Sequence, residues 1–489
     1  MDDSEEGPAF PAARNTSEDE LDKRLNGETG FKHIEIDEKK EIRLVRLSVG
    51  EPESRPVLTL EAAPLADLSS IQYRCLSYTW GQAQHASDVR KLQIDGQDFC
   101  VRQNLYDFLA TAGSKRQAGL FFIDAICINQ LSSREKECQV QEMARIYRHA
   151  DQVIAWLGTP DRDHFSDVRE LAHTNGRQPA SWTAAQWAGF KYLSHHRYWR
   201  RIWIVQEVLL ASSMVVWCGQ FSFPLRLFGS AVQGHQSRET KEDAQGRPSG
   251  TQFDSMRLRS PADVIISHRI RQVVRPVRDD LAQGTSVGTL EEMQIRLRKP
   301  SSAIRSYQSR IPDPLHQAVR KFGKLDCTDQ RDRLYGLLGL VNDRTRARIN
   351  IDYTKDVGYA YYQALKAGLQ ELIPEWDSKA VATWRRDYDI SYLGYYCDVR
   401  DAFGLQEEQS KSVLRQVIEE LSLHDALQAA RNSHSRLLGD LNSTVLPGLE
   451  TLLKYAAEGG EEYDRKEAPQ FDGRLARFHK RQSFTADRL

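Results

Sequence analysis

Apolar runs alternate with amphipathic stretches through the first half of the chain, between about residues 34 and 230. Two runs, LFFID at 120–124 and QVIAWL at 152–157, are almost continuously apolar, as strands covered on both faces are. A helical period over 198–211 precedes another apolar run, MVVWC at 214–218. Strand–helix–strand units of this length predict an α/β domain whose sheet is mostly parallel and flanked by helices.

Local signals predict several element boundaries within this domain. The segment 92–101 carries an Asp-Gly pair at 95–96, which favours a hairpin with a type I′ turn. Asn104 precedes a helical period and is expected to cap that helix. Ser132 and Glu135 stand three residues apart ahead of another helical period, which predicts a capping box.

The second half of the chain has a mainly helical pattern. A polar stretch over 231–262 predicts a linker or loop. Amphipathic periods over 316–322 and 331–340 predict helices beyond it. Thr354 is placed to cap a further helix. We therefore expect a helical C-terminal region over 263–457.

Both ends of the chain are polar. Residues 1–30 hold nine acidic and three basic side chains and almost no large apolar ones. Such a segment buries too little apolar surface to offset its ordering entropy, so we expect disorder over 1–33 and order from near Ile34. Residues 458–489 are expected to form a polar tail, which leaves 34–230 as the α/β domain.

The composition narrows the function classes. The chain has 489 residues, with 67 Lys and Arg against 68 Asp and Glu. This balance argues against a dedicated nucleic-acid binder. No stretch reaches the roughly 18 uninterrupted apolar residues of a membrane span, and the acidic start is unlike a secretion signal. Seven scattered cysteines without a CxxC pair are typical of free thiols in the cytoplasm, and they predict no metal site.

Four blocks of rarer residues stand out in order along the chain. They are YRCLSYTWG at 73–81, FIDAICINQ at 122–130, MARIY at 143–147 leading to VIAWLG at 153–158, and YWRRIWIVQE at 198–207. Together they resemble the fungal heterokaryon-incompatibility (HET) domain family. Two later pieces, DQRDRLYGLLG at 329–339 and DY at 352–353, are similar to a segment that often follows the domain in such proteins.

This resemblance implies a function. HET domains act in fungal self/non-self recognition, a form of innate immunity, and trigger programmed cell death when incompatible cells fuse. They are also remotely similar to TIR domains, which have a flavodoxin-like fold and in several lineages hydrolyse NAD. The resemblance thus implies NAD as a substrate rather than a bound cofactor. It also implies partners that are further copies of the chain or other incompatibility proteins.

The TIR similarity singles out Glu207 as the catalytic residue, because it follows Trp203 on a helix as the TIR glutamate follows a tryptophan. On a continuous helix over 198–211, Glu207 would share a stripe with Trp199 and Trp203 and have no basic residue within pairing distance. A carboxylate there would have a perturbed pKa and could stabilise a ribosyl cation. The alternative is a structural glutamate bonded to a backbone group or to an arginine of another element.

Other candidate site residues carry two interpretations each. Ser77, Tyr78, Trp80 and Gly81 stand at a strand end and turn, where Trp80 could stack on a ligand ring or belong to the core. Asp124 ends an apolar run, where ligands bind in open α/β sheets, or it satisfies the amides of the next loop.

The function itself has alternatives. Instead of hydrolysing NAD, the domain could be a non-catalytic adaptor that assembles through the same surfaces, or an inactive paralogue. The sequence has no P-loop motif.

Overall fold

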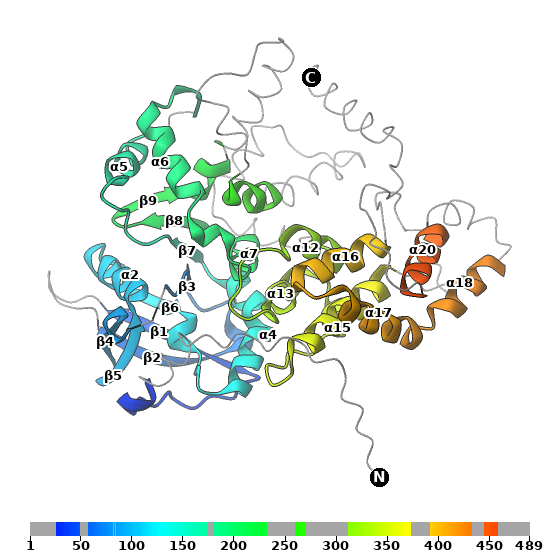
Figure 1. Cartoon of the computed structure of the whole chain (residues 1–489). Coiled ribbons are helices and arrows are strands. Elements are labelled where there is room, and N and C mark those ends of the chain that lie inside the picture. Colours follow the sequence, from blue (N-terminus) through cyan, green and yellow to red (C-terminus); the bar gives the residue numbers. More distant parts are fainter. Residues whose placement is uncertain are drawn as a thin grey trace, which may run out of the picture.

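The computed structural model places an α/β domain and a set of C-terminal helices side by side (Figure 1). Strands and their helices, coloured blue to green, form one part, and the helices coloured yellow to red pack against it. The structure describes residues 26–48, 57–81, 83, 85–174, 179–229, 231, 260–269, 312–372, 392–432 and 445–457.

A nine-stranded sheet forms the α/β domain, with the strand order β5-β4-β2-β1-β6-β3-β7-β8-β9. The α/β class is therefore confirmed. The strands are β1 (Glu41–Ser48), β2 (Val57–Pro64), β3 (Tyr73–Tyr78), β4 (Val89–Ile94), β5 (Gln97–Arg102), β6 (Gly119–Phe122), β7 (Gln152–Trp156), β8 (Met214–Cys218) and β9 (Phe221–Pro224).

The sheet is mixed, with a parallel centre. Strands β6, β3, β7 and β8 are all parallel, whereas β1–β2, β1–β6, β4–β5 and β8–β9 pair antiparallel. Counted in chain order, the four central strands run 2-1-3-4, which is the start of the flavodoxin-like order. In such sheets the winding reverses beside the first strand, here β3, and ligands bind beyond the carboxyl ends of the strands there.

Helices cover both faces of the central strands. On one face lie α4 (Ser133–His149) and α7 (Trp203–Leu210), and the hydroxyl of Tyr73 on β3 donates to the Ile146 carbonyl of α4 at 2.6 Å. On the other face, Phe108 of α2 (Gln103–Ser114) packs against aromatic rings of β6, β7 and β8. The central strands are thus buried on both faces, as their continuous apolar runs predict.

Of two predicted local features, the hairpin turn at Asp95 and Gly96 forms, whereas the helix cap at Asn104 does not. The hairpin is confirmed, since Asp95 and Gly96 have φ of 51° and 74° between β4 and β5. The Asn104 cap is wrong, because α2 begins at Gln103 and the Asn104 side chain instead donates to the Thr79 carbonyl at 2.6 Å. Its Oδ1 accepts the indole N–H of Trp156, so this asparagine joins two strand ends.

Only one of the two hydrogen bonds that define a capping box is formed between Ser132 and Glu135. The Ser132 hydroxyl accepts the Glu135 amide at 3.2 Å, as expected. The carboxylate of Glu135 does not return to Ser132 but pairs with Arg43 of β1 at 2.6 Å. Both side chains of this pair are buried, so the residue predicted as a cap also holds a strand to a helix.

The helix predicted over 198–211 is interrupted. A 3₁₀ turn at Arg197–Arg200 is followed by extended backbone at Arg201, and α7 begins only at Trp203. The interruption has a tertiary cause, since Asp326 donates its amide to the Arg200 carbonyl at 2.6 Å and accepts the Ile202 amide at 3.0 Å. A distant segment thus takes the backbone bonds that a continuous helix would use.

The C-terminal region is helical, as predicted. The helix predicted over 331–340 is nevertheless two short turns, α13 (Asp332–Tyr335) and η6 (Leu338–Leu340). The remaining helices are α12 (Leu315–Phe322), α14 (Asp343–Arg346), α15 (Val357–Leu372), α16 (Tyr392–Phe403), α17 (Glu407–Glu420), α18 (Leu423–Asn432) and α20 (Val445–Ala457).

The Thr354 cap is wrong. Asp356 caps the first turn of α15 instead, accepting the Tyr359 amide at 2.9 Å. The Thr354 amide and hydroxyl both bond to Asp352, which forms a turn before the helix.

The core is continuous between the α/β domain and the C-terminal helices. One cluster of buried apolar side chains runs from Ile42 on β1 to Ala456 on α20. Part of the expected linker contributes to this core, since residues 261–269 are helical and Ala262 is buried. Residues 26–33, which precede the expected start of order, also pack on the domain through Asn26 and Phe31. Among the described residues, no helix is both long and apolar enough to cross a lipid bilayer.

Candidate functional site

Glu207 lies beneath the carboxyl end of β3. Its side chain comes from α7, is 5% exposed, and accepts a hydrogen bond from the Ser77 hydroxyl of β3. Because Ser77 has a single hydroxyl proton, the Tyr198 hydroxyl is the donor in its own bond to Ser77. The three side chains form a buried hydrogen-bonded row, which we call the Glu207 cluster.

Strand alternation and the helix interruption together build this cluster. On β3, Tyr73 and Ser77 point to the α4 and α7 side, as a period of two requires. The interruption at Arg201 lets Tyr198 approach Ser77 from a separate 3₁₀ turn. The Arg201 guanidinium donates to the Tyr78 carbonyl and places a positive charge near Glu207.

The environment favours a protonated Glu207. Burial is the main cause that raises the pKa of its carboxyl, which reaches about 7. The positive charge of Arg201 and the hydrogen bond from Ser77 lower this pKa, and the negative charge of Asp124 raises it. A carboxyl with a pKa near neutrality can exchange a proton under ordinary conditions.

The indoles of the two tryptophans predicted to share a stripe with Glu207 donate their hydrogen bonds to other groups. The indole N–H of Trp203 donates to Asp332 at 2.8 Å, and that of Trp199 donates to the Leu193 carbonyl at 2.8 Å. Because the helix is interrupted at Arg201, Trp199 lies on a separate turn, whereas Trp203 stays on α7, four residues before Glu207. Trp203, predicted as a binding residue, instead connects α7 to the C-terminal region.

Asp124 supplies a second carboxyl near the cluster, and this residue is half-buried. It does not end a strand, because β6 stops at Phe122 and Asp124 opens the short helix α3 (Asp124–Cys127). Its Oδ2 accepts the indole N–H of Trp80 at 3.0 Å, and its Oδ1 accepts the Ala125 amide at 2.8 Å. Burial raises the pKa of this carboxyl, while the bonds from Trp80 and Tyr78 lower it.

The turn after β3 connects these carboxyls to the surface. Gly81 has φ of +87°, a conformation that favours glycine, and its carbonyl accepts the Arg102 guanidinium at 2.7 Å. Arg102 also lies over the indole of Trp80, 5.4 Å from the ring centroid. Trp80 is therefore held in place by Asp124 on its N–H and by Arg102 on its face.

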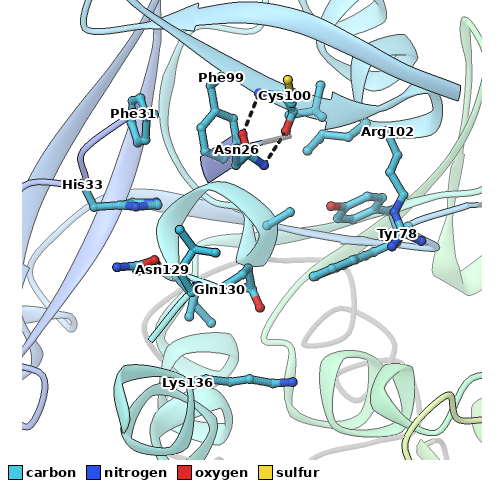
Figure 2. A pocket seen from close by; sticks show the side chains of 16 residues that line it. Asn26, Phe31, His33, Tyr78, Phe99, Cys100, Arg102, Asn129, Gln130 and Lys136 are labelled. Carbon is cyan, nitrogen blue, oxygen red and sulfur yellow. Dashed lines mark hydrogen bonds between the residues drawn. The ribbon is translucent and has the colours of Figure 1, made fainter. Parts of the chain in front are cut away.

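A pocket opens on the outer side of this turn (Figure 2). Tyr78 and Trp80 line it, but Ser77, Asp124 and Glu207 do not. The sequence-predicted residues therefore divide into two groups, with Tyr78 and Trp80 at the pocket and the other three behind them. Gly81 shapes the turn, and Trp203 lies apart.

Three residues of this region are not among those predicted from the sequence. Arg201 stands in the YWRRIWIVQE block, but nothing local indicates its contact with Tyr78, and no local signal marks Arg102. Asp332 accepts the Trp203 indole and the Tyr353 hydroxyl, the latter at 2.7 Å, and its pKa is raised to about 6 mainly by burial. Its place in the DQRDRLYGLLG block was the available signal. Among the described residues, no group of three or more His, Cys, Asp or Glu is arranged to hold a metal ion.

Comparison with known proteins supports the resemblance. Residues 73–207 match the family described as "Heterokaryon incompatibility protein (HET)". The chain is also 23% identical over 356 residues to "Heterokaryon incompatibility protein 6, OR allele" of Neurospora crassa. That alignment covers 61% of this chain and 47% of the relative, so the chain spans about half the length of the curated relative it matches. No solved structure matches the chain.

The matched range includes the four sequence blocks and extends from the first residue of β3 to Glu207. Residues 73–207 are therefore similar to the heterokaryon-incompatibility (HET) domain family.

Proposed function

We propose that this protein acts in fungal self/non-self recognition in the cytoplasm, where its HET domain triggers incompatibility cell death. The family match over 73–207 and the name of the Neurospora crassa relative support this role. We further propose that assembly of several copies switches on hydrolysis of NAD at the Glu207 cluster.

One observation carries the chemical part of the proposal. A buried carboxyl with a pKa of about 7 accepts a serine hydroxyl beneath the carboxyl end of the strand where the sheet winding reverses. Cleavage of the bond between ribose and nicotinamide leaves positive charge on the ribose, and nicotinamide departs with the bonding electron pair. An ionised Glu207 would stabilise that cation until water adds to it, with loss of a proton.

Burial of the cluster implies an activation step. Glu207 is 5% exposed and does not line the pocket, and Tyr78 and Trp80 each line the pocket while bonding to Asp124. Substrate would reach Glu207 only after the Tyr78–Trp80 turn moves. Self-association of the chain is the event that we propose to move it.

The same burial favours a second candidate, a non-catalytic adaptor. Ser77 satisfies Glu207, and Arg201 bonds to the adjacent strand end, so the cluster could serve only to hold α7 against β3. In that case the HET domain would assemble with partners and a partner would cause cell death.

The test is NAD consumption by the full chain clustered on beads, beside Glu207→Gln and Glu142→Gln. Glu142 lies on α4, is only partly buried and is paired with Arg145 at 3.7 Å, so its variant controls for the same chemical change. We expect turnover by the clustered wild type, loss of at least a hundredfold in Glu207→Gln, and no change in Glu142→Gln. Absence of turnover by a folded, clustered wild type would favour the adaptor.

A further inference from the structure

The pocket beyond the Tyr78–Trp80 turn has the position of a ligand site. It lies at the carboxyl ends of β3 and β6, between the turn after β3, the loop after α3 and strand β5. Open α/β sheets bind ligands at this edge. Concave sites with several rings and a few polar groups are typical of small-molecule binding.

The charge of the lining favours an anion. Arg102 and Lys136 are part of the wall, with the Lys136 ammonium at its edge over the Tyr353 ring, 4.5 Å from the centroid, and no Asp or Glu is among the described residues that line it. Burial also lowers the pKa of His33, the third basic residue of the wall, so it is neutral near pH 7. Two cations around a concave, partly apolar space raise the local concentration of anions.

The rings of the lining favour a planar group. Figure 2 shows Tyr78 and Arg102 on one side of the pocket and Phe31 and His33 on the other, with the Gln130 amide between them. Trp80 on the Tyr78 side is already oriented by Asp124 and Arg102, at 3.0 Å and 5.4 Å. Because Trp80 is already ordered, stacking of a ligand ring on it would cost the protein little conformational entropy.

We propose that this pocket binds a small anion that carries a planar aromatic ring, of the mononucleotide class. Its ring lies against Trp80, and its phosphate lies toward Arg102 and Lys136. Neither the family match nor the relative's name assigns a ligand to these residues. The binding proposal stands on the pocket alone.

A consequence for regulation rests on the proposed function. Trp80 and Tyr78 bond to Asp124, and the charge of Asp124 raises the pKa of Glu207. A ligand that repositions Trp80 therefore alters the electrostatics of the Glu207 cluster. Occupancy of the pocket would favour or oppose the movement that exposes Glu207.

The test is calorimetric titration of the full chain with AMP, adenosine, ribose 5-phosphate and inorganic phosphate. We expect AMP to bind at least tenfold more tightly than adenosine or ribose 5-phosphate, and more weakly at high salt. Binding of AMP no tighter than that of inorganic phosphate would overturn the proposal, as would no binding at all.

Variants locate the site. Lys136→Gln should weaken AMP binding about fivefold or more and leave adenosine unaffected, whereas Lys191→Gln, on an exposed face of α6 (Ala184–Ser194), should change neither. Ala125→Leu, which fills the pocket without changing charge, should abolish both, and it decides the matter if Lys136→Gln fails to fold. Wild-type affinity in a folded Ala125→Leu chain would overturn the assignment.

The two proposals fail separately. AMP binding that depends on the pocket, without any NAD turnover, would uphold the site and contradict hydrolysis. NAD turnover that depends on Glu207, without AMP binding, would uphold hydrolysis and contradict the proposed binding site.

Discussion

The carboxyl group of Glu207 is stabilised in its protonated form because burial removes it from water. Its pKa is about 7 in the folded chain against an ordinary value of 4.5. Between these values the folded state holds a proton that the unfolded state releases. The stability that this residue contributes therefore falls as the pH rises from about 4.5 to 7, by about 3 kcal/mol in all.

Glu207→Gln removes this titration while keeping an oxygen that accepts the Ser77 hydroxyl. We expect the stability of the variant relative to wild type to rise by about 2–3 kcal/mol between pH 5 and pH 8. Denaturant unfolding at the two pH values measures it. Glu142→Gln should keep a constant difference from wild type, and a constant difference for Glu207→Gln would contradict the raised pKa.

Two ion pairs allow a comparison of buried and exposed charges. Arg43 and Glu135 have side chains 3% and 5% exposed, whereas those of Arg46 and Glu61 are 44% and 40% exposed. Glu135→Gln leaves a buried guanidinium without its charge partner and should cost about 3–5 kcal/mol. Glu61→Gln should cost no more than about 1 kcal/mol because water screens that pair. Equal costs in chemical denaturation would refute this assignment of burial.

The interrupted helix before α7 shows how distant segments alter predicted elements. Residues 198–211 have a helical period, but Asp326 takes the main-chain bonds of Arg200 and Ile202. The local pattern contains no sign of this, because the competing donor and acceptor lie more than a hundred residues away. The strands β7 and β8, by contrast, are continuously apolar and appear where the pattern predicts them.

Gly339 tests the contact between the C-terminal turns and α7. A Cβ at this position would lie 2.1 Å from Oε1 of Gln206 and 2.7 Å from Cβ of Ala144. Because the alanine contact involves a short side chain next to backbone, Gly339→Ala should destabilise the chain by about 1–3 kcal/mol. Gly27, which has nothing within 4 Å, provides the matched control Gly27→Ala. Thermal unfolding that is unchanged in both variants would contradict this close approach.

The described parts of the molecule form one packed body because the core is continuous between the α/β domain and the C-terminal helices. Ile204 on α7 and Leu334 on α13 are completely buried, and the Gln206 amide donates to the Tyr335 carbonyl at 3.2 Å. Glu137 on α4 accepts the Tyr353 amide at 2.8 Å. The HET domain therefore uses the C-terminal segment as part of its own structure.

Truncation after residue 230 should expose the apolar surface of α7 and α4. We expect the fragment 26–230 to be aggregated or to lack a cooperative thermal transition, whereas the full chain unfolds in one transition that includes both parts. Circular dichroism melts and size-exclusion chromatography of the two proteins check this. A monomeric fragment that melts cooperatively would show that the α/β domain folds independently.

The local sequence pattern was sufficient to predict the α/β class, the buried central strands and the Asp-Gly hairpin, and to reveal the HET resemblance. These features depend on hydrophobic period, turn chemistry and rare residue strings, all of which act over a few neighbouring positions. The resemblance also selected Glu207, whereas Ser77 and Asp124 were selected by their places at predicted strand ends.

Contacts between segments that are remote in the sequence determined the interruption before α7 and the geometry of the candidate site. The Ser77–Glu207 bond joins residues 130 positions apart, and the Trp203–Asp332 bond joins residues 129 positions apart. Such pairings bring together backbone groups and charges that no local window contains. They interrupted the helix before α7, bonded the Trp203 indole to Asp332, and placed Tyr78 and Trp80 between the pocket and the carboxyls of Asp124 and Glu207.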